Sequence, residues 1–522
     1  MSRRRLAAVA AFTLLPGTAL AGTAHADTAE ITIATCAPYR TMTVGDADSC
    51  GADVLTGLFT GLTRFDPATS RSTYAVAKSI TTKDNRVFHV TLRKGWKFHD
   101  GTEVLARNFV EAWNLSASER AGNAFLFEEI QGYGTFEKST RRMSGLKVTG
   151  SHTFTITLTK PFGPFLNKLS HVAFSPLPDS VLKNPASFQK KPIGNGPFRV
   201  VSWSPSSTSV LERFDGYAGT VKPSVSTIAY RAVKTGAAAY SALLSGEIDF
   251  SGFLPTSGQL TDVKTKLGGR LIHRAGGTIQ IVAFPTKVAA NADFRKAVSM
   301  AIDREAITKD VFFGVRVPAH SFTPPVAEGS RRDACGQVCE YNPAEARKYL
   351  AKALASGFRP PAVLPLYYNA DSVHGEWIKP LVAGLNKVFE GKVKFTAKAK
   401  GTFDAFERMT RSGKLDGMYR AGWQLDFPHI QNAVGPMFAS DGIYDGRIYR
   451  SAKFDALLRA ADRERSSAKA IRLYQRAEDQ LVKDLPAIPL WNYGDVAGYS
   501  ERIAKAALTP YGWLDPMTVK LA

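Results

Sequence analysis

The sequence lacks several features that would define common classes of protein. Beyond residues 1–26, no stretch approaches the run of about 18 apolar residues that a membrane-spanning helix needs. The chain holds no G-x-S-x-G, no H-E-x-x-H and no Cys–His nucleophile pattern. The glycines of Ile193–Phe198 are followed by no Lys-Ser/Thr pair, so they form no phosphate loop. We therefore expect no enzyme, although a secreted hydrolase with paired carboxylates remains the main rival class.

The sequence also lacks any concentrated run of positive charge. Its formal net charge is +21, which becomes +18 once the three arginines of residues 1–26 are removed. Such an excess could favour nucleic acid or an anionic surface. The basic residues stand alone or in doublets such as Lys190-Lys191 and Arg331-Arg332, without interleaved aromatics. We expect a cationic exported surface and no nucleic-acid partner.

Cysteine is scarce, with four residues in 522. In an exported chain four cysteines indicate two disulfides, for which three pairings exist. The simplest joins Cys36 to Cys50 and Cys335 to Cys339. A zinc site at Cys335-x3-Cys339 lacks nearby His or Cys partners. The sequence therefore predicts no metal and no other cofactor.

Residues 1–26 have the form of an export signal. A basic start at Arg3–Arg5 precedes an apolar run, Leu6–Leu15, and Ala24-His25-Ala26 gives the A-x-A cleavage pattern. The mature chain should begin at Asp27. Ser2-Arg3-Arg4 leaves a twin-arginine route open beside general secretion. No Cys follows the apolar run closely, so we expect an exported, secreted or envelope-associated protein without a lipid anchor.

Composition and hydrophobic periodicity indicate a large globular α/β protein. The chain is 44% hydrophobic and 22% charged, and its length suggests two to four domains. Arg86–Arg93 alternates cleanly, whereas Asn291–Ile307 has helical spacing with Asp293 as its expected N-cap and Asp303 as the cap of a following helix. Other expected strands are one through Ile31 and Ile33, His152–Thr159, Ile279–Phe284, Leu364–Asn369 and Leu490–Tyr493; other expected helices are Asp53–Leu62, Ala237–Ile248, Pro343–Ala355, Phe454–Ala461, Ser467–Leu485 and one that opens at His374.

The stretch Arg420–Pro428 combines the residue types of a binding site. It holds one cation, one carboxylate, a Trp and a Phe beside Gly422 and Pro428. Mixed polar and aromatic groups suit a concave site with a few placed charges. Arg420 and Asp426 lie six positions apart, up to about 20 Å in an extended chain, which is enough to meet opposite ends of one zwitterion. The alternative is a surface turn with a buried Trp anchor.

Six motifs give the chain a resemblance to a known family. The runs at Leu92–Thr102 and Phe294–Glu305 are specific as a pair in this order, and each alone would be weak. The motifs are L-F-T-G-L at Leu58–Leu62, L-R-K-G-W-K-F-H-D-G-T at Leu92–Thr102, I-G-N-G-P-F at Ile193–Phe198, F-R-K-A-V-S-M-A-I-D-R-E at Phe294–Glu305, G-W-Q-L-D-F-P at Gly422–Pro428 and L-P-A-I-P-L at Leu485–Leu490. With these the chain resembles family 5 of the extracellular solute-binding proteins, the peptide-binding subunits of ABC importers.

The resemblance implies a two-lobed α/β fold of the periplasmic-binding-protein type II class, with an extra domain and a hinge between the lobes. The chain should cross the hinge near Gln280 and again near Pro486, and the lobes should close over the ligand. The expected parts are residues 27–55, 178–280 and 487–522 for lobe I, residues 56–177 for the extra domain, and residues 281–486 for lobe II.

The resemblance also implies roles for individual residues. Asp426 should pair with a peptide's ammonium group, and Arg420 and His374 with its carboxylate. A zwitterion buried without partners would be costly, and charge-assisted hydrogen bonds offset that cost. The peptide's own amides need strand-like pairing. The remaining expected ligand contacts are Asn369, Gly422, Trp423, Phe427 and Trp491.

The implied partners are short peptides together with the permease and ATPase subunits of an importer, and we expect a monomer. The same fold could instead take an oligosaccharide, with Trp423, Phe427 and Trp491 stacking on the sugars, or a nickel complex, an opine or another small solute. A signalling or chaperone-like use of the cleft is a third possibility. The chain departs from the family at Phe284-Pro285-Thr286, at Phe427 and at His429, where F-N-T, Tyr and an acid are common.

Overall fold

The computed structural model describes residues 29–36, 44–67, 69–118, 122–135, 142–254, 260–284, 291–444 and 446–522. The expected export signal lies outside these ranges, as does Pro285-Thr286 of the F-P-T variant. Among the described residues, no helix combines the length and the apolar character needed to cross a membrane.

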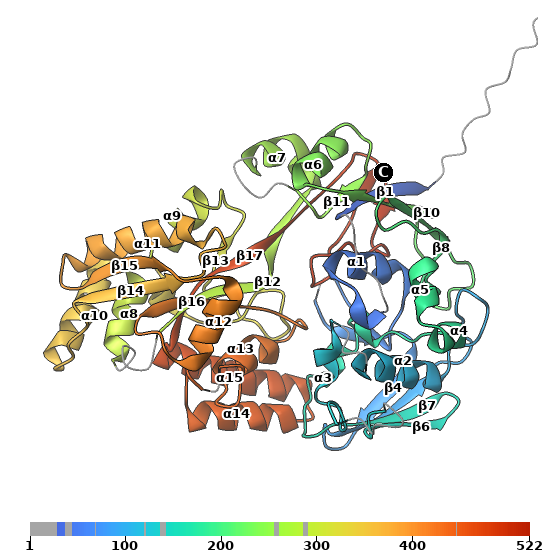
Figure 1. Cartoon of the computed structure of the whole chain (residues 1–522), viewed down its shortest axis with the longest axis horizontal. Coiled ribbons are helices and arrows are strands. Elements are labelled where there is room, and N and C mark those ends of the chain that lie inside the picture. Colours follow the sequence, from blue (N-terminus) through green and yellow to red (C-terminus); the bar gives the residue numbers. More distant parts are fainter. Residues whose placement is uncertain are drawn as a thin grey trace, which may run out of the picture.

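The described chain forms two lobes joined by one continuous sheet (Figure 1). The strand order of this sheet is β15-β14-β16-β12-β17-β11-β1-β10-β9-β8, and β13 pairs with β17 beside this path. Strands β12 (Leu271–Ala283) and β17 (Ala487–Tyr499) run through both lobes. This mixed sheet with helices around it confirms the α/β, two-lobed prediction.

Lobe I contains the first half of the chain and the C-terminal segment, on the right of Figure 1. Beside its share of the main sheet it holds a separate four-stranded sheet in the order β4-β5-β7-β6. Its strands are β1 (Glu30–Cys36), β2 (Thr63–Phe65), β3 (Ser72–Tyr74), β4 (Ala77–Thr82), β5 (Val87–Leu92), β6 (Leu146–Gly150), β7 (Thr153–Thr157), β8 (Phe198–Ser202), β9 (Thr208–Arg213), β10 (Thr227–Val233), β11 (Phe250–Ser251), β18 (Ile503–Lys505) and β19 (Lys520–Leu521). Its helices are η1 (Val44–Asp46), α1 (Ser49–Leu58), α2 (Ala106–Ser118), η2 (Ala124–Phe127), α3 (Phe165–Lys168), η3 (Val172–Phe174), α4 (Asp179–Lys183), α5 (Ala186–Lys190), α6 (Gly236–Leu244), α7 (Leu260–Leu267) and η4 (Gly268–Arg270).

Lobe II contains the residues between the two crossing strands, on the left of Figure 1. Its strands are β13 (Val317–Pro318), β14 (Val363–Tyr368), β15 (Lys394–Ala399) and β16 (Met418–Gln424). Its helices are α8 (Ala292–Met300), α9 (Arg304–Asp310), η5 (Gly336–Cys339), α10 (Pro343–Ala355), α11 (His374–Phe389), α12 (Phe403–Ser412), α13 (Ile430–Phe438), α14 (Ala452–Arg463) and α15 (Ser467–Asp484).

The crossing strands change register where they pass between the lobes. Leu271–Ala275 pairs with Gly494–Gly498, Ile279 resumes pairing at Asn492, and a second shift follows Gln280. A β-carbon on Gly494 would lie 2.0 Å from the Val315 carbonyl oxygen, so only glycine fits there. One of the two register shifts lies at Gln280, the residue near which the sequence predicts the first crossing.

The start of β17 packs with lobe II. Ile488, Leu490 and Trp491 are fully buried in a core cluster made of lobe II helices and strands. Packing therefore ties the first half of β17 to lobe II. We propose that the second crossing falls at residues 492–494, and the remaining domain boundaries stay predictions.

The alternating pattern of β5 determines how the four-stranded sheet packs. Phe88, Val90 and Leu92 are buried, as the alternation predicted, and they share one core with α2. Trp113 of α2 is fully buried, and its Nε1 donates to the Phe174 carbonyl oxygen at 3.0 Å. This satisfied indole shows why a Trp can lie at the centre of the core.

The Phe294–Glu305 motif builds two short helices rather than one. Asn291 caps α8, since its Oδ1 accepts from the Phe294 N–H at 2.9 Å, so the expectation of Asp293 as the cap was wrong. Asp293 lies in the first turn, where it pairs with Lys352. Asp303 caps α9 by accepting from the Ala306 N–H at 2.9 Å, which confirms the second cap.

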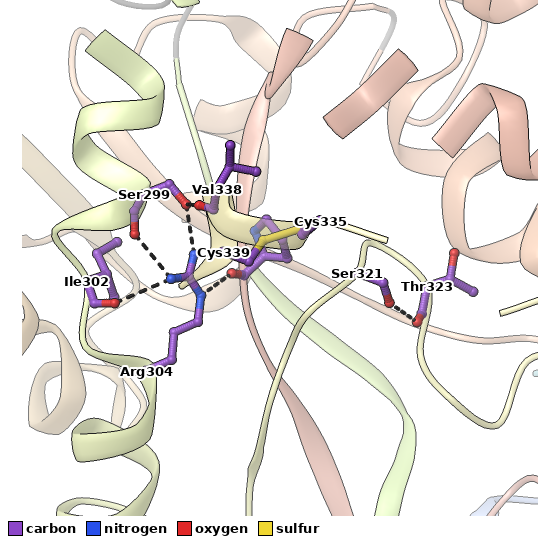
Figure 2. Close-up of a disulfide and its surroundings, with 9 residues drawn as sticks. Ser299, Ile302, Arg304, Ser321, Thr323, Cys335, Val338 and Cys339 are labelled. Atoms are coloured by element: carbon purple, nitrogen blue, oxygen red, sulfur yellow. Dashed lines mark hydrogen bonds between the residues drawn. A yellow bond between two sulfur atoms is a disulfide. The ribbon is translucent and has the colours of Figure 1, made fainter. Parts of the chain in front are cut away.

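Arg304 ties this motif to β17 (Figure 2). Its Nε donates to the Pro489 carbonyl oxygen at 2.8 Å, and its other nitrogens donate to the Ser299 hydroxyl and to carbonyl oxygens of Ser299 and Ile302. Burial lowers the Arg304 pKa to about 9. No described carboxylate pairs with it, so oriented carbonyl dipoles stabilise this charge.

The disulfide loop of lobe II joins the same cluster. The Ser299 hydroxyl donates to the Val338 carbonyl oxygen at 2.6 Å, inside the loop closed by Cys335 and Cys339 (Figure 2). The other disulfide joins Cys36 at the end of β1 to Cys50 at the start of α1. Both bonds therefore close short loops, with sequence separations of 14 and 4 residues.

Candidate functional site

The larger of two neighbouring cavities lies between the lobes and encloses about 600 Å³. Lobe I lines it with seven residues between Phe125 and Lys168, and lobe II lines it with residues of the segment that runs from the end of β16 to α14. Asp426, in the turn between β16 and α13, lines this cavity. The stretch that the sequence singled out is thus part of an interlobe surface.

Asn432 and Tyr511 hold the Asp426 turn in place. The Asp426 N–H donates to Oδ1 of Asn432 at 2.7 Å, and Nδ2 of Asn432 donates back to Oδ2 of Asp426 at 3.1 Å. The Trp423 indole donates to the same Asn432 oxygen at 3.3 Å, and the Tyr511 hydroxyl of lobe I donates to the Asp426 carbonyl oxygen at 3.3 Å. Among the described residues no group donates to Oδ1 of Asp426. One carboxylate oxygen therefore remains available to a ligand.

The larger cavity is acidic although the whole chain is basic. Burial raises the Asp426 pKa, while the Asn432 amide and the Lys168 ammonium lower it. Burial and the neighbouring Glu129 also raise the pKa of Glu128. The six lining carboxylates are Glu128, Glu129, Asp426, Asp441, Asp455 and Asp462, and the three lining cations are Lys160, Lys168 and Arg459.

Lys168 already has a counter-ion inside this cavity. Its ammonium lies 2.6 Å from each carboxylate oxygen of Glu129, and only 3% of the lysine is exposed. The ammonium also lies 5.9 Å and 5.5 Å from the ring centroids of Phe162 and Phe427. Phe427 belongs to lobe II, so this ion pair packs across the interface between the lobes. Glu129 therefore largely neutralises the charge of Lys168 inside the protein.

The smaller cavity encloses about 270 Å³ and lies beside the larger one. Trp423 and Ile443 line both cavities and therefore form a common wall. The charged residues of the smaller cavity are Arg411 and Arg420 with a single acid, Glu407. Its charge balance is thus opposite to that of the larger cavity.

Arg420 of β16 lies in the smaller cavity without an ion-pair partner among the described residues. Its Nε donates to Oδ1 of Asn369 at 2.9 Å, and its guanidinium lies 5.3 Å and 5.5 Å from the ring centroids of Phe403 and Phe406. Burial lowers the Arg420 pKa, and the more distant Glu407 carboxylate raises it. The guanidinium is oriented by a neutral amide and keeps its charge.

His374 is a buried, neutral neighbour of this arginine. Burial, followed by the charges of Arg420 and Arg316, lowers the His374 pKa to about 3. Its Nδ1 accepts a hydrogen bond from the Trp377 indole at 3.0 Å. His374 begins α11, as the sequence predicted.

Comparisons with known proteins show which family the chain belongs to. The profile described as bacterial extracellular solute-binding proteins, family 5 Middle, matches residues 73–445. The chain belongs to this family. The match confirms the resemblance that the six motifs suggested.

Relatives in the family carry names that refer to peptides. The periplasmic oligopeptide-binding protein OppA of Escherichia coli is 24% identical over 461 residues, which span 85% of this chain and 82% of that protein. The dipeptide-binding protein DppE of Bacillus subtilis is 24% identical over 475 residues, with 88% and 86% coverage. The unliganded open form of MppA, a periplasmic murein tripeptide binding protein, superimposes with a TM-score of 0.86 at 21% identity, covering 95% of this chain and 98% of that chain. Haemophilus influenzae OppA in complex with RPPGFSPFR superimposes with a TM-score of 0.65 at 19% identity, covering 95% and 99%.

The other residues expected to contact the ligand lie at different places around the two cavities. Phe427 is buried, lines the larger cavity and packs edge-to-face on Phe162. Gly422 lines the smaller cavity, and a β-carbon there would lie 2.8 Å from the Ile279 carbonyl oxygen, so close strand packing requires glycine. Asn369 contacts Arg420. Trp423 separates the two cavities.

Trp491 is a correction to the sequence-based set. It is fully buried and packs edge-to-face on Trp377 and Phe312, with ring centroids 4.9 Å and 5.2 Å away. It lines neither cavity. The strand that carries it is covered on both faces in lobe II, so the indole is a core residue and offers no stacking surface to a sugar or peptide.

Sequence reasoning missed Asn432, Lys168, Glu129 and Tyr511. These residues come from three segments far apart in the chain, and no local motif marks them. Asn432 alone had a usable signal, because it lies in the first turn of a helix that closely follows Asp426. Among the described residues, no group of three or more His, Cys, Asp and Glu side chains could hold a metal ion.

Proposed function

We propose that this protein is the extracytoplasmic substrate-binding subunit of an ABC importer and captures short peptides between its lobes for delivery to a membrane permease. The supporting observation is the pair of adjoining cavities with opposite charge balance. The acidic one contains Asp426, the basic one contains Arg420, and Trp423 stands between them. A short zwitterion that spans this wall meets a complementary charge at each end.

The hydrogen bonding of the two charged groups supports the same assignment. In the described part of the chain one carboxylate oxygen of Asp426 receives no hydrogen bond, which suits a peptide ammonium. Arg420 uses its Nε on Asn369, and its remaining N–H groups suit a carboxylate. Charge-assisted hydrogen bonds of this kind are about twice as strong as neutral ones. Asp426 is thus the proposed ammonium-binding residue, and Arg420, with His374 beside it, marks the proposed carboxylate end.

Closure of the lobes around the peptide is part of the proposal. MppA superimposes with a TM-score of 0.86 in its unliganded open form, but a second structure of the Escherichia coli protein gives 0.67 at the same 21% identity. The higher score belongs to the form described as open, which supports an open arrangement of the lobes in the present structure. Rotation about the register shifts of β12 and β17 would bring the walls together.

The same reasoning covers location, assembly and the domain scheme. An importer subunit of this kind works outside the cytoplasm, in agreement with the expected export signal. We propose that it acts as a monomer, with residues 56–177 as the extra domain of lobe I. The oligosaccharide alternative loses Trp491 as a stacking residue, because that indole is buried.

Thermal unfolding with defined ligands tests the proposal. A ligand at 100 times its Kd should stabilise the fold by about 2.7 kcal/mol. We expect a mixed pool of di- to pentapeptides to raise the Tm, and an N-acetylated pool of the same sequences to raise it far less. A rise with cello-oligosaccharides and none with peptides would overturn the assignment in favour of a sugar-binding member of the family.

A further inference from the structure

Arg316 carries a second guanidinium beside the smaller cavity. It directly precedes β13, which pairs with β17 at Trp491 and Asn492. The guanidinium carbon lies 3.8 Å from the ring centroid of Phe312 and 4.0 Å from that of Tyr493. Its Nη1 is buried and has no hydrogen-bond partner in the described part of the chain. No described carboxylate forms an ion pair with Arg316.

Tyr493 connects Arg316 to the cavity that contains Arg420. The phenol lines that cavity, and its hydroxyl donates to Oε1 of Gln280 at 3.3 Å. His374 lies within electrostatic reach of both guanidinium groups, because each of them lowers its pKa. Arg316 therefore stacks on a tyrosine that lines the cavity of Arg420, and in the described residues neither arginine has a counter-ion.

This arrangement is costly unless a negative charge joins it. Like charges that lie close together with little water between them repel each other, and a buried N–H without an acceptor loses its hydration without compensation. Stacking on Phe312 and Tyr493 fixes the guanidinium plane, and the Tyr493 hydroxyl is a neutral acceptor that leaves Nη1 unpartnered among the described residues and the charge without a counter-ion. A carboxylate supplies both the missing charge and planar acceptors that match the guanidinium fork.

We propose that Arg316 is a second carboxylate-binding residue, which acts with Arg420 on one carboxylate of the bound ligand beside Tyr493. This inference rests on the proposed peptide-binding function and makes it more specific. The carboxylate could be the peptide's C-terminus or the side chain of an Asp or Glu residue in the peptide. Either source presents the same chemistry to the two arginines.

The test compares ligands that differ only in this carboxylate. Isothermal titration would measure Kd for Ala-Ala-Ala, for its C-terminal amide, and for the amide of Ala-Ala-Glu, with the wild type and with Arg316→Met. Methionine keeps an unbranched apolar chain against Phe312 and Tyr493. We expect the wild type to prefer a carboxylate-bearing peptide over Ala-Ala-Ala amide, and the variant to lose about tenfold of that preference. Affinity for Ala-Ala-Ala amide should change much less.

Controls separate this role from general damage. Arg347, exposed on lobe II and paired loosely with Glu390 at 3.7 Å, gives the matched variant Arg347→Met, which should bind all three peptides as the wild type does. Arg316→Lys, which keeps the charge without the fork, should lose part of the preference and substitutes for Arg316→Met if the latter does not fold.

Each outcome has a distinct meaning. If Ala-Ala-Ala loses affinity in the variant, the C-terminus is the carboxylate held; if only Ala-Ala-Glu amide does, the side chain is. The role of Arg316 is overturned if Arg316→Met keeps the wild-type ratio of Kd values between carboxylate-bearing peptides and Ala-Ala-Ala amide. It is also overturned if the wild type binds peptides with and without the carboxylate equally well. Both results leave peptide binding intact. A wild type that binds none of these peptides and no mixed peptide pool would instead refute the proposed function.

Discussion

Asp426→Asn is the substitution that most directly separates ligand binding from folding. The change keeps the size of the side chain, and an amide oxygen can still accept from Nδ2 of Asn432. It removes the negative charge and replaces the second carboxylate oxygen with an amide N–H group. A peptide ammonium that meets this group loses its main counter-ion and faces a donor instead of an acceptor.

The expected loss follows from the surroundings of Asp426. Truncating one partner of a buried charged pair costs about 2–5 kcal/mol. Glu128 lines the same cavity and continues to attract a cation, so we expect the lower part of this range. A loss of about 2–3 kcal/mol corresponds to a Kd increase of roughly 30- to 150-fold. The empty protein should be no less stable than the wild type, since burial raises the Asp426 pKa and the variant no longer buries that charge.

Isothermal titration with a tripeptide and its N-acetyl derivative provides the assay. The wild type should bind the free amine roughly 30- to 150-fold more tightly than the N-acetyl form. Asp426→Asn should bind both forms with nearly equal affinity. Asp441→Asn is the matched control, because Asp441 lines the same cavity but is 82% exposed and lies 3.7 Å from Lys160. An Asp426→Asn variant that keeps the wild-type preference for the free amine would refute the ammonium assignment.

Two further predictions concern stability. Arg304→Met should lower the free energy of unfolding by about 2–4 kcal/mol in urea, since it removes the buried guanidinium hydrogen bonds to Pro489, Ser299 and Ile302; wild-type stability would mean that water replaces the guanidinium. Burial lowers the His429 pKa from 6.5 to about 3, and its Nδ1 accepts from the Gln431 N–H, so the stabilisation it gives is complete above pH 6.5 and is lost as the pH falls toward 3. His429→Asn keeps a helix cap that does not titrate, and its unfolding free energy should fall less than that of the wild type between pH 6.5 and pH 4; superimposable pH profiles would contradict this.

Local patterns in the sequence predicted the regular elements well where one face is buried. Pro343–Ala355 is helical over the predicted range, and the alternation at Phe88 and Val90 gives the buried face of β5. The break between α8 and α9 was marked only by Asp303, the expected cap of a following helix, because apolar spacing continues through Ala301 and Ile302 while the chain turns. Asn291 and Asp293 both suited a cap, and only the backbone decides which one bonds to the free N–H groups.

Long-range pairing explains what periodicity could not reveal about the hinge. The sequence predicted a short strand at Leu490–Tyr493, whereas β17 extends from Ala487 to Tyr499. Gly494 and Asp495 interrupt the hydrophobic pattern inside this strand. Their place is set by the approach of Val315 and by a salt bridge from Arg274 to Asp495 at 3.1 Å, both of which come from distant parts of the chain. Because the two halves of β17 are buried to different extents, the hydrophobic pattern of the sequence predicted only part of the strand.

The kind of partner that each buried charge has inside the protein distinguishes Lys168 from the two residues proposed to bind ligand. Lys168 is neutralised by Glu129, which makes it part of the packing between lobes. Asp426 and Arg420 are instead held by the side-chain amides of Asn432 and Asn369. A neutral amide fixes the direction of a charged group but leaves its charge uncompensated, so the field remains available to an incoming molecule. The two cavities, on either side of Trp423, therefore contain charges of opposite sign, at Asp426 and at Arg420, that side-chain amides orient without neutralising. A short zwitterion is the simplest molecule that could neutralise both charges at once.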